Sequence, residues 1–159
     1  AKRVCKIKAY ISLQLVAASI CILSYWVGAE QVTLAFSLFF LWSFFLQMAT
    51  PLLWSKMVDT IDYGQWKTGI RMSGMIFSAV VFFIKLGVAL GGAIAGWLLA
   101  YYGYQADMAQ SDETRQGILI SFTLFPAIGS LLVAWVMRWY ILDDKTVEKI
   151  HRELTTVNG

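Results

Sequence analysis

Four long apolar segments dominate this sequence, at about residues 9–27, 32–58, 72–102 and 117–142. A bilayer core is roughly 30 Å thick and is crossed by about 20 apolar residues in a helix, so each segment is long enough to span it. Of 159 residues, 58% are hydrophobic and only 14% charged, which leaves more apolar surface than a small soluble domain can bury. The sequence therefore predicts an all-α integral membrane protein with four transmembrane helices.

The lysines and arginines predict the orientation of these spans, because basic residues are retained on the cytoplasmic side during insertion. One side of the membrane would hold Lys2, Arg3, Lys6, Lys8, Lys56, Lys67, Arg71, Arg138, Lys145, Lys149 and Arg152. The opposite side would hold Arg115, beside several acids. We expect residues 1–8, the 59–71 connector and the tail to be cytoplasmic, in a multi-pass protein of a plasma membrane such as the bacterial inner membrane.

The tail, residues 143–159, admits two interpretations. Val147, Ile150, His151 and Leu154 fall at helical spacing, and Asp143 and Asp144 suit a helix start, which favours a short amphipathic helix on the cytoplasmic surface. A solvated tail explains the same composition.

Composition excludes several other classes. A net charge of +3, scattered between apolar runs, does not suit nucleic-acid binding. Cys5 lies in a basic flank and Cys21 in an apolar run, so neither a disulfide framework nor a metal-ligand spacing is present. No Walker motif, buried acid pair or catalytic set is visible, so we expect neither an enzyme nor a bound cofactor or metal.

Lys85 lies near the middle of the third span, at least thirteen residues from either end. A lysine at mid-membrane costs about 2.5 to 3.5 kcal/mol even on permissive insertion scales, and this one is too deep to reach an interface easily. No Asp or Glu lies within the four apolar cores. We interpret Lys85 as a functional side chain that faces a polar cavity, with its partner elsewhere.

Small residues follow Lys85 along the same span. Gly92 and Gly96 lie seven and eleven residues after it, and Gly87 and Gly91 form a second pair at GxxxG spacing. Such stripes let helix backbones approach closely, so these glycines are interpreted as helix-packing positions.

One face of the second span carries Gln47, Thr50 and Trp54, which share a side of the helix. Polar groups do not face lipid unsatisfied, so this face is expected to point inward. An aromatic ring beside hydrogen-bonding groups suits a sugar, whereas hydrogen bonding between helices explains Thr50 equally well. Gln47 and Trp54 are the stronger candidates for the cavity, and Pro51 is expected to kink the helix.

The 59–71 connector carries two acids, Asp59 and Asp62, with Gly64 and Gly69 as flexible points and Lys67 and Arg71 as bases. These groups could form a charge cluster that breaks and re-forms as a cytoplasmic mouth opens and closes. A solvated turn is the alternative.

At this connector the sequence resembles a known family. The run MVDTIDYGQWKTGIR, with WSKMVD entering it and GMIFS following it, resembles the glycoside/pentoside/hexuronide:cation symporters of the major facilitator superfamily, the group of the melibiose permease. The resemblance covers nearly the whole chain. Members have twelve helices in two halves, so it implies that the four spans match the last four.

The resemblance implies uptake of a sugar or glycoside with a cation, H+ or Na+, by alternating access. By position, Lys85 resembles a lysine near the sugar and cation pocket, and the cytoplasmic gate would comprise Asp59, Asp62, Tyr63, Gly64 and Arg71. Relatives often have Glu where this chain has Gln65, which removes one salt bridge from the gate. In the family that this chain resembles, the acids that bind the cation lie mainly in the amino-terminal half. The expected partners are therefore the missing amino-terminal helices, together with the sugar and the lipid bilayer.

Two other classes of membrane protein are alternatives. A small four-helix membrane protein could act as a homo-oligomer, either a multidrug exporter or a structural subunit. Small proton-coupled exporters need a membrane-embedded carboxylate, which the apolar segments lack, and a structural role would not require Lys85. A membrane enzyme would need a nucleophile, metal site or acid–base pair.

Overall fold

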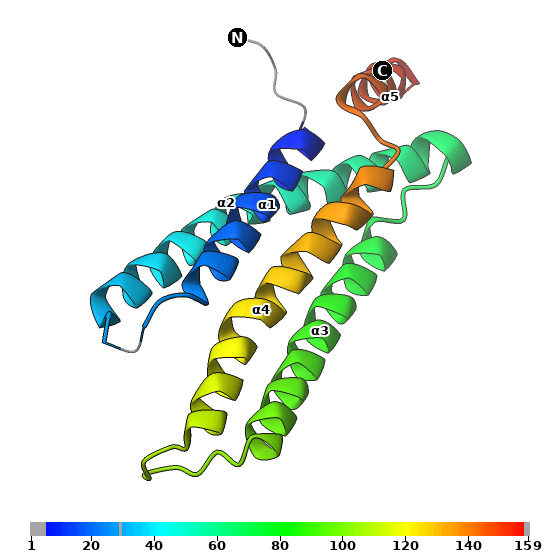
Figure 1. The fold of residues 1–159 in the computed structure, drawn as a ribbon. Coiled ribbons are helices and arrows are strands. Elements are labelled where there is room, and N and C mark those ends of the chain that lie inside the picture. Colours follow the sequence, from blue (N-terminus) through cyan, green and yellow to red (C-terminus); the bar gives the residue numbers. More distant parts are fainter. Residues whose placement is uncertain (1–5, 29, 158–159) are drawn as a thin grey trace.

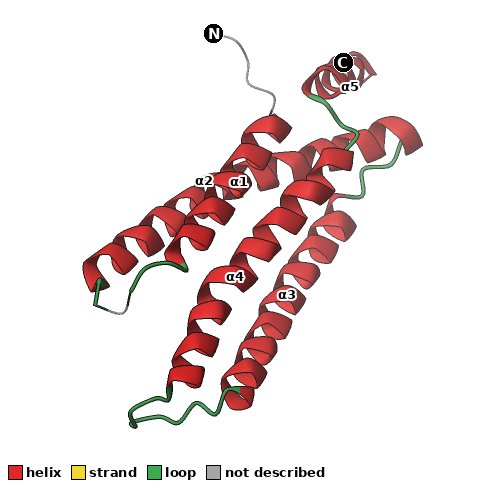
Figure 2. Ribbon diagram, viewed as in Figure 1, coloured by secondary structure: helices red, strands yellow, loops and turns green. Residues whose placement is uncertain are grey.

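The computed structural model describes residues 6–28 and 30–157. The described part contains helices and connecting loops and no strand (Figure 2). The helices are α1 (Lys6–Ser24), α2 (Val32–Thr68), α3 (Ser73–Tyr101), α4 (Asp112–Val136), the short 3-10 helix η1 (Met137–Trp139) and α5 (Asp144–Val157). Among the described residues 4 helices are long and apolar enough to cross a membrane, so the predicted all-α class with four spans is confirmed.

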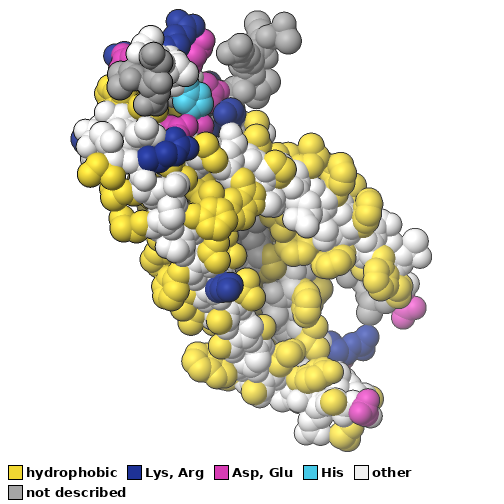
Figure 3. Space-filling view, turned by 180° about the vertical axis from the view of Figure 1, so that it is seen from behind, with side chains coloured by type: hydrophobic (Ala, Val, Ile, Leu, Met, Phe, Trp, Pro, Cys, Tyr) yellow, Lys and Arg dark blue, Asp and Glu magenta, His cyan; other side chains and the backbone are white. Residues whose placement is uncertain are grey.

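The four long helices run alternately up and down (Figure 1). α1 contacts both α2 and α4, whereas α3 lies at the edge and contacts α4 and α2. The start of α1, the α2–α3 connector and α5 all lie at one end of the bundle. We call this the polar end, because charged side chains gather there while the flanks are largely hydrophobic (Figure 3).

Small side chains form the contact of α1 with its two neighbours. Ala17 and Ala18 of α1, Ala49 of α2 and Ala127 and Ala134 of α4 are each at most 4% exposed. Alanine lets membrane helices approach closely. Because lipid is as apolar as the helix surface, the hydrophobic effect does not hold the helices together, and dispersion between the closely packed atoms supplies the attraction. These alanines account for the close α1–α2 and α1–α4 packing.

The fourth span begins earlier than predicted, at Asp112 rather than near residue 117. Ser111 caps the helix, since its Oγ accepts a hydrogen bond from the Thr114 amide at 3.2 Å. Asp112 and Glu113 then lie in the first turn, where the helix dipole favours negative charge. The prediction that this polar turn belongs to the connector is therefore wrong.

The prediction of a loop over 59–71 is wrong for most of its length. α2 continues through Pro51 to Thr68 and ends where Gly69 adopts a left-handed φ of 74° and its amide bonds the Gln65 carbonyl. Asp59, Asp62, Tyr63 and Gly64 therefore lie on a helix. At 37 residues α2 is about 55 Å long, so its polar last third extends beyond a bilayer core of about 30 Å.

The tail forms the helix α5, which confirms the predicted short helix rather than a solvated tail. Its apolar residues Val147 and Ile150 are 7% and 1% exposed and cluster with Leu142, Tyr63 and Leu154. α5 thus docks on the polar extension of α2. Residues 1–5, which include Lys2, Arg3 and Cys5, lie outside the described residues.

Candidate functional site

Lys85 is exposed on α3, and no residue of that helix is buried in the described chain. Within residues 6–28 and 30–157 its ammonium has neither a hydrogen bond nor an ion pair, although the helix around it is apolar. A cation at this depth requires a partner or water.

The second-span candidates divide into two settings. Gln47 and Thr50 are both exposed, and the Thr50 hydroxyl lies 3.4 Å from Gln47 Oε1. Trp54 instead stacks on Phe77 of α3, with ring centroids 5.7 Å apart, at the edge of a largely apolar cavity of about 180 Å³. The structure gives no hydrogen bond between Lys85 and any of these three residues in the part it describes.

The four glycines that follow Lys85 make no close packing in the described chain. A Cβ added at Gly87, Gly91, Gly92 or Gly96 would have no atom within 4 Å. Their predicted role in helix packing could be met only by a surface outside these residues.

The polar end holds a first charge cluster, which we call the Lys56 network: Lys56, Asp59, Asp144 and Lys6. Lys56 and Asp59 are 3% and 4% exposed, and Lys56 Nζ lies 3.2 Å from Asp59 Oδ2. Lys56 Nζ also lies 3.4 Å from Asp144 Oδ1 and donates to the Leu142 carbonyl at 3.3 Å. Lys6 Nζ approaches Asp59 at 3.8 Å. One buried lysine thus joins α2 to α5.

Tyr140 closes this network from the end of η1. Its hydroxyl donates to the Lys56 carbonyl at 3.0 Å and lies 3.0 Å from Thr60 Oγ1. The Lys56 ammonium is 5.5 Å from the Tyr140 ring centroid, within cation–π range.

Asp144 is the acid that α5 contributes. Partial burial, the largest single effect, raises its pKa, but hydrogen bonds from the Lys6 amide and Lys56 and their positive charges outweigh burial and leave the pKa lowered. Its contribution to docking is therefore present above the ordinary pKa of an aspartate and is lost as pH falls through the lowered value.

A second cluster, the Asp62 network, consists of Asp62, Arg71, Gln65 and His151. Asp62 is 8% exposed, and its Oδ1 accepts from Arg71 Nη1 at 2.9 Å. Its Oδ2 lies 2.9 Å from His151 Nε2 of α5, and a carboxylate only accepts, so this nitrogen carries the proton. Arg71 also donates to Gln65 Oε1 at 2.8 Å. The uncharged amide of Gln65 therefore accepts a hydrogen bond from Arg71, in place of the salt bridge that a Glu would form.

Tyr63 and Gly64 have structural settings in this region. The Tyr63 ring packs on the apolar residues of α5 and lies 6.0 Å from the Trp66 ring. Gly64 is inside the helix, where its carbonyl accepts from Thr68 Oγ1 at 2.8 Å. Trp66 Nε1 in turn donates to Glu153 of α5 at 2.6 Å.

The sequence analysis identifies Asp59, Asp62 and Arg71 but not Lys56, Asp144 and His151, which also hold the two acids. Lys56 precedes Asp59 by three residues, a spacing that predicts an ion pair once the segment is recognised as helical. Asp144 and His151 are seven residues apart and so share a face of α5. No sequence signal indicates the element on which that face docks.

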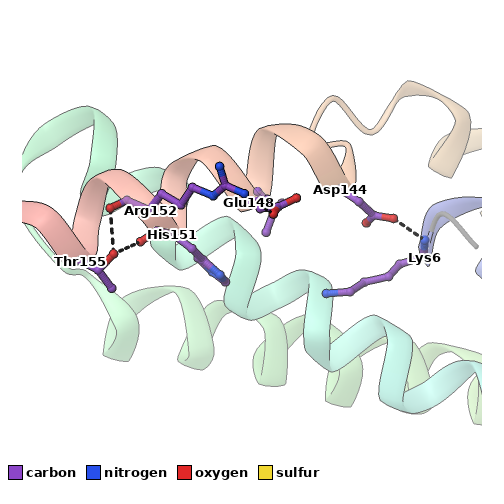
Figure 4. Close-up of a pocket in the computed structure, with 7 residues that line it drawn as sticks. Lys6, Asp144, Glu148, His151, Arg152 and Thr155 are labelled. Atoms are coloured by element: carbon purple, nitrogen blue, oxygen red, sulfur yellow. Dashed lines mark hydrogen bonds and ion pairs between the residues drawn. The ribbon is translucent and has the colours of Figure 1, made fainter. Parts of the chain in front are cut away.

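A cavity of about 670 Å³ lies beside these networks, between the start of α1 and α5. Figure 4 shows Asp144 directed at Lys6 and His151 directed from α5 toward α2. The residues that line it are Lys6, Asp144, Val147, Glu148, His151, Arg152 and Thr155. Lys85 does not line this cavity, and the described residues contain no group of three His, Cys, Asp or Glu side chains that could hold a metal ion.

Comparisons with known proteins give a consistent set of relatives. Residues 1–144 match the family described as MFS/sugar transport protein. The inner membrane symporter YicJ of Escherichia coli is 36% identical over 94% of this chain, and the glucuronide carrier protein homolog of the same species is 33% identical over 84%. The uncharacterized symporter YnaJ of Bacillus subtilis is 39% identical over 64%.

The chain spans 33%, 29% and 22% of the lengths of these three relatives, in that order. No solved structure matches significantly.

Proposed function

The chain belongs to the MFS/sugar transport protein family, and from this membership we propose that it forms the last four helices of a twelve-helix transporter that carries a sugar or glycoside with a cation. Two relatives are named symporters and one a glucuronide carrier homolog, which supports both coupling and a glycoside or hexuronide substrate. Transport would proceed by alternating access between two halves.

The observation that carries this proposal is the unpaired Lys85 on α3. It is exposed amid apolar residues, and no described residue of the chain pairs with it. In the proposed transporter the amino-terminal half supplies the opposing carboxylates and water, and the substrate cavity lies between the two surfaces. Lys85 then binds substrate oxygens or competes with the coupling cation for those acids.

The exposed faces of α2 and α3 would line the rest of the cavity. Gln47 and Thr50 offer hydrogen-bonding groups to a sugar, and Trp54 offers an aromatic face. The open glycines Gly92 and Gly96 leave room for a close helix or for substrate.

The polar end would be the cytoplasmic gate, with both ends of the chain in the cytoplasm. The lysines and arginines gather there, and the name of YicJ places that relative in an inner membrane. In the gate, Asp59, Asp62 and Arg71 would exchange their ion pairs as the mouth opens. The coupling ion, H+ or Na+, would be bound mainly by residues outside this chain.

The test is uptake of radiolabelled glycosides, pentosides and hexuronides by the full-length transporter in vesicles, with and without a Na+ or H+ gradient. We expect gradient-dependent uptake of one substrate class, reduced at least about tenfold by Lys85→Ala, since the proposed contact of Lys85 with the substrate or with carboxylates of the amino-terminal half is then lost. Arg138→Ala, which removes an exposed base with no ion pair in the described chain, is the matched control and should retain uptake.

Absence of uptake for every sugar, in correctly inserted protein, would contradict the proposed function. Undiminished uptake by Lys85→Ala would preserve the transporter and remove Lys85 from its site.

A further inference from the structure

The tail helix supplies a partner to each of the two gate acids. We propose that Asp144 and His151 are positioning residues for transport: Asp144 acts on Asp59 through the shared Lys56, and His151 acts directly on Asp62. This inference rests on the proposed function, because it assigns to α5 the control of the carboxylates that would open and close the cytoplasmic mouth.

An apolar contact with α2 fixes the position of α5. Ile150 is 1% exposed and Val147 is 7% exposed, and both cluster with Tyr63 of α2. Tyr63 lies one residue after Asp62 and four after Asp59. The seat of α5 is therefore built into the same two turns that carry the gate acids.

Asp144 determines what Lys56 can offer to Asp59. An ammonium has three donors, and Lys56 directs two hydrogen bonds to Asp144 Oδ1 and the Leu142 carbonyl. Asp59 Oδ2 is within ion-pair distance of Lys56, yet it is buried without a hydrogen-bond donor among the described residues. With α5 docked, Asp59 is thus held by charge while one oxygen retains free acceptor capacity.

His151 acts on the second acid more simply. Arg71 occupies one oxygen of Asp62 and His151 occupies the other, each at 2.9 Å. Two donors on opposite oxygens fix the plane of a carboxylate, which one donor does not. Loss of His151 would leave Asp62 paired with Arg71 but free to rotate.

The contacts of α5 with α2 thus reach both gate acids from one helix face. Figure 4 shows Asp144 and His151 on the side of α5 that faces α1 and α2. Arg152 and Glu148 pair with each other on the helix surface, at 2.7 Å.

The test combines hydrogen exchange with transport kinetics in the full-length transporter. His151→Leu and Asp144→Ala should speed amide exchange of residues 144–157 by about tenfold or more, because each removes a charge-assisted contact that closes the helix on α2. Both should lower the maximal uptake rate about fivefold or more and leave the KM for sugar within about twofold, since neither residue belongs to the proposed sugar cavity beside Lys85.

Two further variants separate positioning from a general loss of structure. His151→Gln keeps a donor near the position of Nε2 and should restore most of the rate. Lys145→Gln removes an exposed charge next to Asp144 that has no hydrogen bond or ion pair in the described chain, and it should match the wild type in exchange and in uptake.

The outcomes distinguish the two proposals. A wild type that takes up no sugar would overturn the proposed function and this inference together. A wild type that transports, with His151→Leu unchanged in maximal rate or unchanged in exchange, would overturn the positioning role alone.

Discussion

Lys56 and Asp59 place a pair of opposite charges where little solvent reaches, each at most 4% exposed. A buried pair of this kind contributes little net stability, since desolvation offsets the attraction, but removal of one partner leaves an uncompensated charge. Lys56 also bonds a carbonyl and Asp144. Its removal should therefore loosen both α2 and α5.

The first prediction concerns this pair. Lys56→Met should lower the free energy of unfolding by about 3 to 5 kcal/mol, because Asp59 stays buried and keeps only its longer contact with Lys6, at 3.8 Å. The double variant Lys56→Met, Asp59→Leu should recover much of that loss. Reversible unfolding in mixed micelles with increasing dodecyl sulfate measures both.

Lys149→Met is the control for loss of a lysine. Its partner Glu153 lies 3.7 Å away on an exposed surface, and such a pair contributes under about 1 kcal/mol. Equal losses for Lys56→Met and Lys149→Met would show that the burial of Lys56 has no energetic consequence.

At this scale the sequence predicted the acids better than their partners. Asp59 and Asp62 stand out because acids are rare near apolar segments. The sequence also predicts that Arg71 belongs to the same charge cluster, and its 2.9 Å contact with Asp62 confirms that they are neighbours. Asp144 and His151 are ordinary tail residues until tertiary contacts bring α5 against α2, and no local pattern encodes that docking. The gating role of the cluster and the cavity role of Lys85 stay predictions.

At the scale of the helices, the predicted end of α2 and the predicted start of α4 are both wrong. Polar residues outside a bilayer suit a loop and an exposed helix equally, so the polar turns at the end of α2 and the start of α4 were both assigned to connectors. The stop at Gly69 has a physical signature, a left-handed φ of 74° that a glycine adopts without strain.

The second prediction compares two glycines at the end of α2. Gly69→Ala should destabilise the last turn by about 1 kcal/mol, because a side chain is strained at this positive φ. Gly64→Ala should stabilise it by a similar amount, since Gly64 is helical and a Cβ there has no neighbour within 4 Å. Amide exchange of residues 60–68 reads both changes, and slower exchange in Gly69→Ala would contradict the cap.

The third prediction concerns the contact of α4 with the end of α3. A Cβ at Gly117 would overlap the ring of Tyr102, whose carbonyl also accepts a hydrogen bond from Thr114 at 2.6 Å. Gly117→Ala should cost about 1 to 3 kcal/mol through overpacking. Thermal unfolding in detergent checks the loss.

Gly129→Ala, on the same helix, supplies the control. Its Cβ would meet nothing within 4 Å, so it should be neutral or stabilising by up to about 1 kcal/mol. A Gly117→Ala variant as stable as Gly129→Ala would show that Tyr102 does not pack there in solution.

For the molecule as a whole, the sequence predicted the class well. Four spans follow from hydrophobic length alone, and the predicted resemblance to sugar symporters of the major facilitator superfamily is confirmed by the family match over residues 1–144. The named relatives are symporters and carriers, so the expectation that the chain is not an enzyme is confirmed as well.

The surface of the bundle could not be predicted from pattern. α3 has no buried residue in the described chain, and its glycines meet no neighbour. In a membrane, the face of a helix that contacts lipid and the face that contacts protein are both apolar. Hydrophobic periodicity therefore cannot distinguish them. The proposed amino-terminal half would cover α3 and would supply the partner for Lys85.

Coupled transport of a sugar with a cation is tested most directly by one measurement. The full-length transporter is reconstituted into vesicles, and the steady-state concentration of its labelled glycoside inside is compared with that outside, before and after an ionophore collapses the cation gradient. A symporter accumulates the sugar above the external concentration and releases the excess when the gradient is lost. Accumulation that never exceeds the external level, or that is indifferent to the ionophore, would contradict the account.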